Sequence, residues 1–146
     1  MSLAHQPFRS VPTAAIAAVR RYRDADLGQR IAVATPHELV AMLYTGAREA
    51  LTAACAATRA ADAAARVASA TRAMSILDAL DGALDHGRGG TVARALSAAY
   101  AQIRAVTVAA NTERSADLFT AAATQLANLG GGWASIIPRS EQRVAV

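Results

Sequence analysis

Residues 35–47 read Thr-Pro-His-Glu-Leu-Val-Ala-Met-Leu-Tyr-Thr-Gly-Ala, and this stretch decides the fold because it begins a long amphipathic helix. The Thr35 hydroxyl can accept a hydrogen bond from the backbone N–H three residues later, and Glu38 can reach back toward Thr35. Pro36 suits a first helical position because it has no N–H to satisfy. We expect His37 to lie at the exposed first turn. The apolar residues that follow recur at helical spacing, so one side of this helix must pack against other elements.

The composition favours a single all-helical domain. The chain has 146 residues, of which 53% are hydrophobic and only 4% aromatic, and Ala is the commonest residue type. Ala is the best helix former and packs helices closely, whereas β-rich domains need the Val, Ile, Tyr and Phe that are scarce here. A chain of this length forms one domain by the usual size range and is long enough to bury a core.

Apolar residues at helical spacing predict four helices joined by short connections. The expected helices cover residues 36–57, 63–85 and 92–110, with a fourth that runs from 116 toward 133. Asp62, Thr91 and Ser115 precede the second, third and fourth helices as N-caps. Helices of about twenty residues with short connections predict an all-α fold, an antiparallel up-down-up-down four-helix bundle.

The rows expected to pack lie along one side of each helix, and glycines mark two expected ends. The rows are Val67, Ala70, Met74, Leu77, Leu80 and Leu84 in the second helix, and Val92, Leu96, Ala99, Ile103, Val106 and Ala110 in the third. Residues 86–90 are predicted to end the second helix, with a glycine in the left-handed conformation at its C-cap. Gly130–Gly132 are predicted to end the fourth helix early and to leave Trp133, Ile136 and Ile137 as a less regular apolar tail.

Both ends of the chain are interpreted as lying outside the bundle. Residues 1–18 and 138–146 are predicted to be flexible tails, and residues 19–137 form the bundle domain. Residues 19–31 alternate charged and apolar side chains, and Gly28 weakens any continuous helix through them. We expect a short helix or an extended segment docked on the bundle by three side chains, Tyr22, Leu27 and Ile31.

The distribution of charge limits the kinds of partner that the protein is expected to bind. The formal net charge is +4 and the pI is about 10.2, and all of the strongly basic residues are Arg. A nucleic-acid surface is usually a clustered basic stripe, whereas these arginines are scattered except at Arg20, Arg21 and Arg23. The uncharged stretch 118–138 is too polar for a membrane span. Neither nucleic-acid binding nor membrane insertion is expected. The single Cys55 cannot form an internal disulfide, so nothing points to an oxidising compartment and the cytoplasm is expected.

Motifs that carry catalysis are missing from the sequence. No Glu is followed three residues later by His, as a di-iron bundle requires, and the glycines near residue 90 lack the strand and lysine of a phosphate loop. Asp78, Asp81 and Asp85 look like a solvated acidic edge. Cys55 has no neighbouring His and is predicted to be a buried, inert thiol. We therefore expect no enzyme, no catalytic residue, no metal site and no cofactor.

An ordered set of residues resembles one known family. It comprises Tyr22-Arg-Asp-Ala-Asp-Leu27, residues 34–47, Gly89-Gly-Thr-Val-Ala93, Tyr100, Ala110-Asn111 and Trp133. Together these look like the flagellar secretion chaperone family FliS, over roughly residues 20–137. The sequence departs from the family pattern at Thr45, Gln102, Thr107 and the glycine run.

The resemblance implies a cytoplasmic chaperone that binds the C-terminal segment of flagellin, prevents premature polymerisation and keeps the subunit competent for the flagellar export apparatus. Flagellin segments would fold as helices in apolar grooves of the bundle, without ATP. The implied flagellin-binding residues are Tyr22, Leu27, Ile31, Val40, Leu43, Tyr44, Ala47, Leu51, Tyr100, Ile103 and Asn111. Each apolar member can instead belong to the core, and core packing is favoured for Leu43 and Ile103.

Two other interpretations of the sequence stay open. The first is a regulatory or nucleic-acid-binding helical bundle that uses Arg20, Arg21, Arg23 and Arg30, and the second is a plain dimerisation bundle. A homodimer is also open for the chaperone. We further hypothesise that Tyr22 and Leu27 cover part of the groove in the free protein and move when flagellin arrives, because a charged, Gly28-interrupted segment directly precedes the capped helix.

Overall fold

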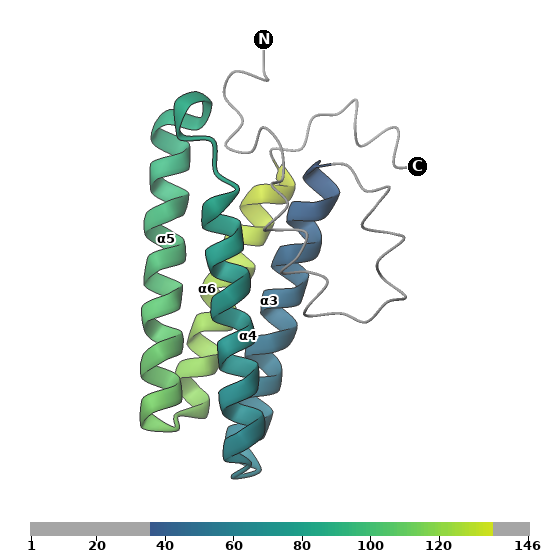
Figure 1. Ribbon diagram of the computed structural model, residues 1–146, viewed down its shortest axis with the longest axis vertical. Coiled ribbons are helices and arrows are strands. Elements are labelled where there is room, and N and C mark those ends of the chain that lie inside the picture. Colours follow the sequence, from purple (N-terminus) through teal and green to yellow (C-terminus); the bar gives the residue numbers. More distant parts are fainter. Residues whose placement is uncertain (1–35, 136–146) are drawn as a thin grey trace.

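Four antiparallel helices form a closed bundle in the computed structural model, which describes residues 36–135 (Figure 1). They are α3 (Pro36–Arg59), α4 (Ala63–Gly82), α5 (His86–Glu113) and α6 (Ala116–Ser135). Each helix packs against the next, and α6 packs back against α3, so α3 lies diagonally opposite α5. The predicted up-down-up-down bundle is thereby confirmed. The predicted tails and the segment at 19–31, as well as the Thr35 cap, lie outside the described residues.

The connections at one end of the bundle are tight turns without glycine. After α3, Ala61 has φ 56°, and the Asp62 N–H donates to Ala57 O at 2.9 Å. After α5, Arg114 has φ 54°, and the Ser115 N–H donates to Ala110 O at 2.9 Å. Both pairs of features are those of the Schellman motif, which satisfies the last carbonyls of a helix.

Two of the predicted N-caps are confirmed at these same turns. The Ala65 N–H donates to Asp62 Oδ1 at 3.0 Å, and the Leu118 N–H donates to Ser115 Oγ at 3.1 Å. Each cap satisfies a backbone donor that the first turn of the helix leaves without a partner. Short polar caps and tight turns together set α3 against α4 and α5 against α6.

The α4–α5 connection differs from the prediction. α4 already ends at Gly82, and its C-cap is Ala83 in the right-handed region rather than a glycine. Residues 86–89 form a helical turn of α5 instead of a loop, and the left-handed residue is Gly90, with φ 53° and ψ −124°, where α5 kinks. Buried Leu84 packs into the core between the two helices, which turns the chain before the glycines are reached.

α6 does not end at the glycine run, so that prediction is wrong. The helix continues through Gly130–Gly132 and includes Trp133, ending at Ser135. Glycine costs about 1 kcal/mol relative to Ala in a helix, but it does not forbid one when the rest of the helix packs. On the core side of α6, Phe119, Ala122 and Leu126 are fully buried. Ile136 and Ile137 lie outside the described residues.

The predicted core rows of α4 and α5 are confirmed at most positions but are wrong at the first residue of each row. Val67 and Val92 are 45% and 47% exposed, so neither belongs to the core. In α5, Ile103 and Ala110 are buried as predicted, and Tyr100 and Thr107 are buried beside them. Both valines sit in the first turns after a bend, where the apolar spacing continues in sequence but the side chain points away from the neighbouring helices.

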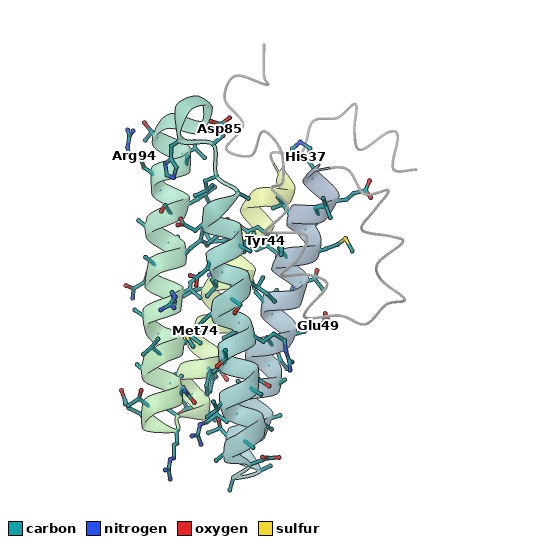
Figure 2. All side chains as sticks on the ribbon, in the orientation of Figure 1. His37, Tyr44, Glu49, Met74, Asp85 and Arg94 are labelled. Carbon is teal, nitrogen blue, oxygen red and sulfur yellow. The ribbon has the colours of Figure 1, made fainter. Side chains whose placement is uncertain are left out.

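His37 also corrects the sequence-based expectation. It is only 8% exposed, although it was expected on the surface of the first turn. It lies at the start of α3, at the end of the bundle where Asp85 and Arg94 are also found (Figure 2). Within residues 36–135, no helix is both long and apolar enough to traverse a lipid bilayer.

Candidate binding surface

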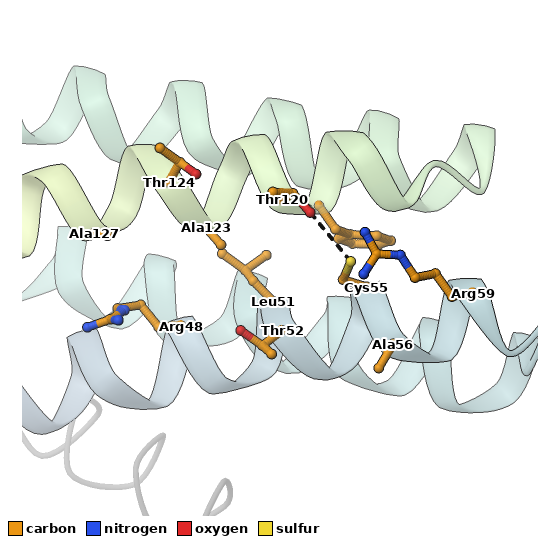
Figure 3. A pocket seen from close by; sticks show the side chains of 11 residues that line it. Arg48, Leu51, Thr52, Cys55, Ala56, Arg59, Thr120, Ala123, Thr124 and Ala127 are labelled. Atoms are coloured by element: carbon orange, nitrogen blue, oxygen red, sulfur yellow. Dashed lines mark hydrogen bonds between the residues drawn. The ribbon is translucent and has the colours of Figure 1, made fainter.

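A groove of about 390 Å³ runs between α3 and α6 (Figure 3). Residues of both helices line it along about three helical turns. They are Arg48, Leu51, Thr52, Cys55, Ala56 and Arg59 of α3, and Phe119, Thr120, Ala123, Thr124 and Ala127 of α6.

Small residues create this groove. On α6, Thr120, Ala123, Thr124 and Ala127 follow the spacing that places side chains on one face of a helix. None of these side chains is long enough to fill the space beside α3. The floor is closed by Leu51 and by Phe119 from the two helices, both fully buried. The result is a narrow hollow with an apolar floor and short walls.

Two polar side chains that line the groove, Cys55 and Thr120, form hydrogen bonds within the bundle. The Cys55 thiol lies 3.5 Å from both Ala116 O and Thr120 Oγ1, and the Thr120 hydroxyl donates to Ala116 O at 3.1 Å. Cys55 is buried, as predicted. Cys55 and Thr120 therefore have partners within the bundle, whereas Arg48 and Arg59 keep exposed charged groups in the groove.

The sequence-predicted binding residues are divided between two places. Tyr22, Leu27 and Ile31 lie outside the described residues. So do the arginines of the alternative nucleic-acid-binding interpretation, Arg20, Arg21, Arg23 and Arg30. The buried ones are Val40, Leu43, Tyr44, Ala47, Leu51, Tyr100 and Ile103, each at most 4% exposed. Of these, Leu51 alone also lines the groove. Their part in binding a client stays a prediction, since the described state uses them as core.

Tyr44 and Tyr100 meet in the centre of the bundle. Their hydroxyl oxygens lie 2.6 Å apart, and their ring centroids lie 6.2 Å apart at an angle of 58°. Tyr44 belongs to α3 and Tyr100 to α5, so this hydrogen bond spans the diagonal of the bundle. Burial raises the pKa of both phenols, since an ionised phenolate would lose its hydration.

Asn111 has a structural partner. Its Oδ1 accepts a hydrogen bond from Arg66 Nε at 2.9 Å, which joins α5 to the start of α4. Asn111 is half-buried, and its backbone carbonyl accepts from the Arg114 N–H at 3.4 Å in the turn before α6. The residue therefore supports the connection at this end of the bundle, whatever else it contacts.

The acidic edge of α4 is engaged with α5 rather than only solvated. Asp78 Oδ1 accepts from Arg104 Nε at 3.1 Å, and Asp81 Oδ1 accepts from Ser97 Oγ at 2.6 Å. A second, smaller cleft of about 130 Å³ lies beside these pairs. Among the described residues, no group of three His, Cys, Asp or Glu side chains is arranged to hold a metal ion.

The sequence interpretation missed most of the groove. Arg48, Arg59 and the small residues of α6 were not among the predicted contacts. One signal was present, the spacing of Thr and Ala at 120, 123, 124 and 127 beside the larger core residues of the same helix. That signal is weak, because Ala and Thr occur on many exposed helix faces.

The fold and the groove define a class: a small antiparallel four-helix bundle with an open groove between two of its helices. A family model described as "Flagellar protein FliS" matches residues 18–140 of the chain. The chain belongs to the FliS family of flagellar secretion chaperones, which are not enzymes.

Two relatives support this assignment along the whole bundle. The chain is 29% identical over 122 residues to the flagellar secretion chaperone FliSB of Pseudomonas aeruginosa, which covers 84% of this chain and 97% of the relative. It is 27% identical over 123 residues to the flagellar secretion chaperone FliS of Salmonella typhimurium, covering 84% of this chain and 91% of that protein.

Proposed function

We propose that this protein acts in the cytoplasm as an export chaperone that binds the C-terminal segment of flagellin. Binding would prevent premature polymerisation and keep flagellin competent for the flagellar export apparatus. Membership of the FliS family supports this role. The observation that carries the binding mode is the open groove of about 390 Å³ between α3 and α6, which extends over about three helical turns and is lined largely by short side chains.

The groove suits a client that folds as it binds. A disordered segment that becomes an amphipathic helix buries its apolar side chains, and part of that gain offsets the cost of ordering the segment. The short side chains that line the groove, such as Ala123 and Ala127, allow close approach of such a helix. Extended contact with several faces of the bundle would then give affinity without a deep pocket.

The proposal is tested by obstructing the groove without disturbing the core. Ala56 is an exposed wall residue of the groove, and Ala53 is an exposed residue of the same helix that does not line it. Ala56→Trp should weaken binding of a flagellin C-terminal segment, measured by calorimetry, by about tenfold or more, because a groove-filling ring excludes the helix. Ala53→Trp is the matched control and should leave the affinity within about twofold.

Two results would contradict this proposal. If wild-type protein fails to bind a flagellin C-terminal segment, the chaperone role itself is wrong for this client. If both tryptophan variants bind as tightly as wild type, the α3–α6 groove is not the contact surface, even though the client is correct. Thermal melting of each variant checks that the bundle still folds.

The N-terminal hypothesis is tested separately. If Tyr22 and Leu27 cover part of the groove in the free protein and move when flagellin arrives, a chain that begins at Ala34 should bind the flagellin segment with a different affinity from the full-length chain. Unchanged affinity would contradict the hypothesis. Sedimentation of the free protein and of the complex tests whether a homodimer forms, and binding to purified export-apparatus components tests the delivery step.

A further inference from the structure

Two arginines stand at opposite ends of the α3–α6 groove. Arg48 and Arg59 both line it from α3, eleven residues apart, which corresponds to about three turns or roughly 16 Å along the helix. Figure 3 shows Arg48 and Arg59 at the two ends, with Thr52, Cys55 and Ala56 between them. Both side chains are exposed, so they can reorient toward an occupant of the groove.

The groove offers these arginines no counter-charge. None of the residues that line it is acidic. In contrast, Arg66 and Arg104 elsewhere on the bundle bond to Asn111 and Asp78. Within residues 36–135, neither Arg48 nor Arg59 forms an ion pair with an Asp or Glu. The groove therefore combines short side chains along its length with two positively charged side chains that α3 holds about three helical turns apart.

We propose that this groove selects an amphipathic helix whose apolar face is flanked by carboxylates about three turns apart, in register with Arg48 and Arg59. The inference rests on the proposed function and states the chemistry of the flagellin segment that occupies the groove. Guanidinium groups bind carboxylates through two parallel hydrogen bonds, which fix position along the groove as well as charge. A helix with basic residues at the same positions is repelled, so the arginines also discriminate against other amphipathic helices.

The eleven-residue spacing of Arg48 and Arg59 determines which spacing of acidic residues in a client helix is selected. Residues eleven apart on a helix lie on nearly the same side, because eleven residues make slightly more than three full turns. A client helix lying along α3 meets both arginines only if its acidic residues repeat with a similar period. An acidic residue moved by two positions points away from the groove and contacts neither guanidinium. The arginines thus set the register of the client along the groove.

The test uses the full-length protein and the C-terminal segment of the flagellin encoded in the same genome. Arg48→Glu and Arg59→Glu should each weaken binding by about fivefold at low salt, and the double variant by more than tenfold. Arg94 is an exposed residue of α5 that does not line the groove. Arg94→Glu is therefore the matched control and should change the affinity by less than about twofold. The difference between wild type and double variant should shrink at high salt.

A charge exchange sharpens the result. Changing two acidic residues of the flagellin segment that lie about three turns apart to Lys should weaken binding to wild type and restore binding to the double variant. If wild type binds the segment and the double variant binds it equally well at every salt concentration, this inference is wrong while the proposed function stands. If wild type does not bind the segment at all, the proposed function fails first.

Other occupants give distinct results. If the reversals leave flagellin binding unchanged and dissociate a dimer seen by sedimentation, the groove holds a second copy and the inference is overturned. If they leave flagellin binding unchanged and abolish binding to a duplex DNA probe, the arginines bind phosphate and the inference is again overturned. Restored binding by the exchanged charges supports the inference.

Discussion

The hydroxyl pair at the centre of the bundle gives a sharp prediction about stability. Tyr44 and Tyr100 are 4% and 2% exposed, and their hydroxyl oxygens lie 2.6 Å apart. Tyr44→Phe or Tyr100→Phe alone leaves one buried hydroxyl without its partner, which costs about 1–3 kcal/mol. The double substitution removes both hydroxyls and keeps both rings, so its cost should be smaller than the sum of the single costs.

The assay is a double-mutant cycle from urea unfolding followed by circular dichroism. We expect a coupling free energy of about 1 kcal/mol or more between the two hydroxyls, with unchanged dependence on urea. For a chain of this size 1 kcal/mol corresponds to about 2–4 °C in the melting temperature, so thermal scans provide an independent measure. Additive single and double costs would refute the reasoning, because they would show that each hydroxyl is satisfied without the other.

Three further predictions follow from the same structure. The free energy of unfolding should fall as the pH rises above about 10, because the phenols of Tyr44 and Tyr100 ionise there in the unfolded chain while burial raises their pKa in the folded protein. Urea midpoints measured across pH should fall less steeply for the double Phe variant. Ala61→Gly should stabilise the bundle by about 0.5–1 kcal/mol in urea unfolding, since φ 56° strains a residue with a Cβ, and an unchanged midpoint would argue against that strain. Gly131→Ala should raise the melting temperature by about 2 °C, because a Cβ there meets no atom within 4 Å and Ala favours the helix, whereas a lower value would mean that α6 frays before this residue.

The helices themselves were readable from the sequence because their signals are local. Asp62 and Ser115 cap backbone N–H groups only three residues away, so their effect depends on little else. The errors arose where a local preference competed with packing. The glycines at 130–132 disfavour a helix individually, yet α6 passes through them because its preceding turns are anchored by Phe119 and Leu126.

The exposure of Val67 and Val92 and the burial of Thr107 could not be predicted in the same way. In an Ala-rich helix the residues on both sides are small and apolar, so periodicity gives little contrast between buried and exposed faces. Val67 and Val92 fit an apolar row in the sequence but are nearly half exposed, while Thr107 is fully buried and donates its hydroxyl to Ile103 O at 2.8 Å. Only the positions of neighbouring helices distinguish these residues.

The amino-acid sequence by itself determined that the protein is a four-helix bundle, where most of its helices begin, and which family it resembles, because propensity, capping and ordered motifs are properties of the chain alone. The tertiary structure decided which faces pack and which stay open. It paired Tyr44 with Tyr100 across the diagonal, and it placed Arg48 and Arg59 at the ends of one groove. The groove exists because small residues of two helices far apart in sequence face each other, and that juxtaposition depends on how the helices assemble.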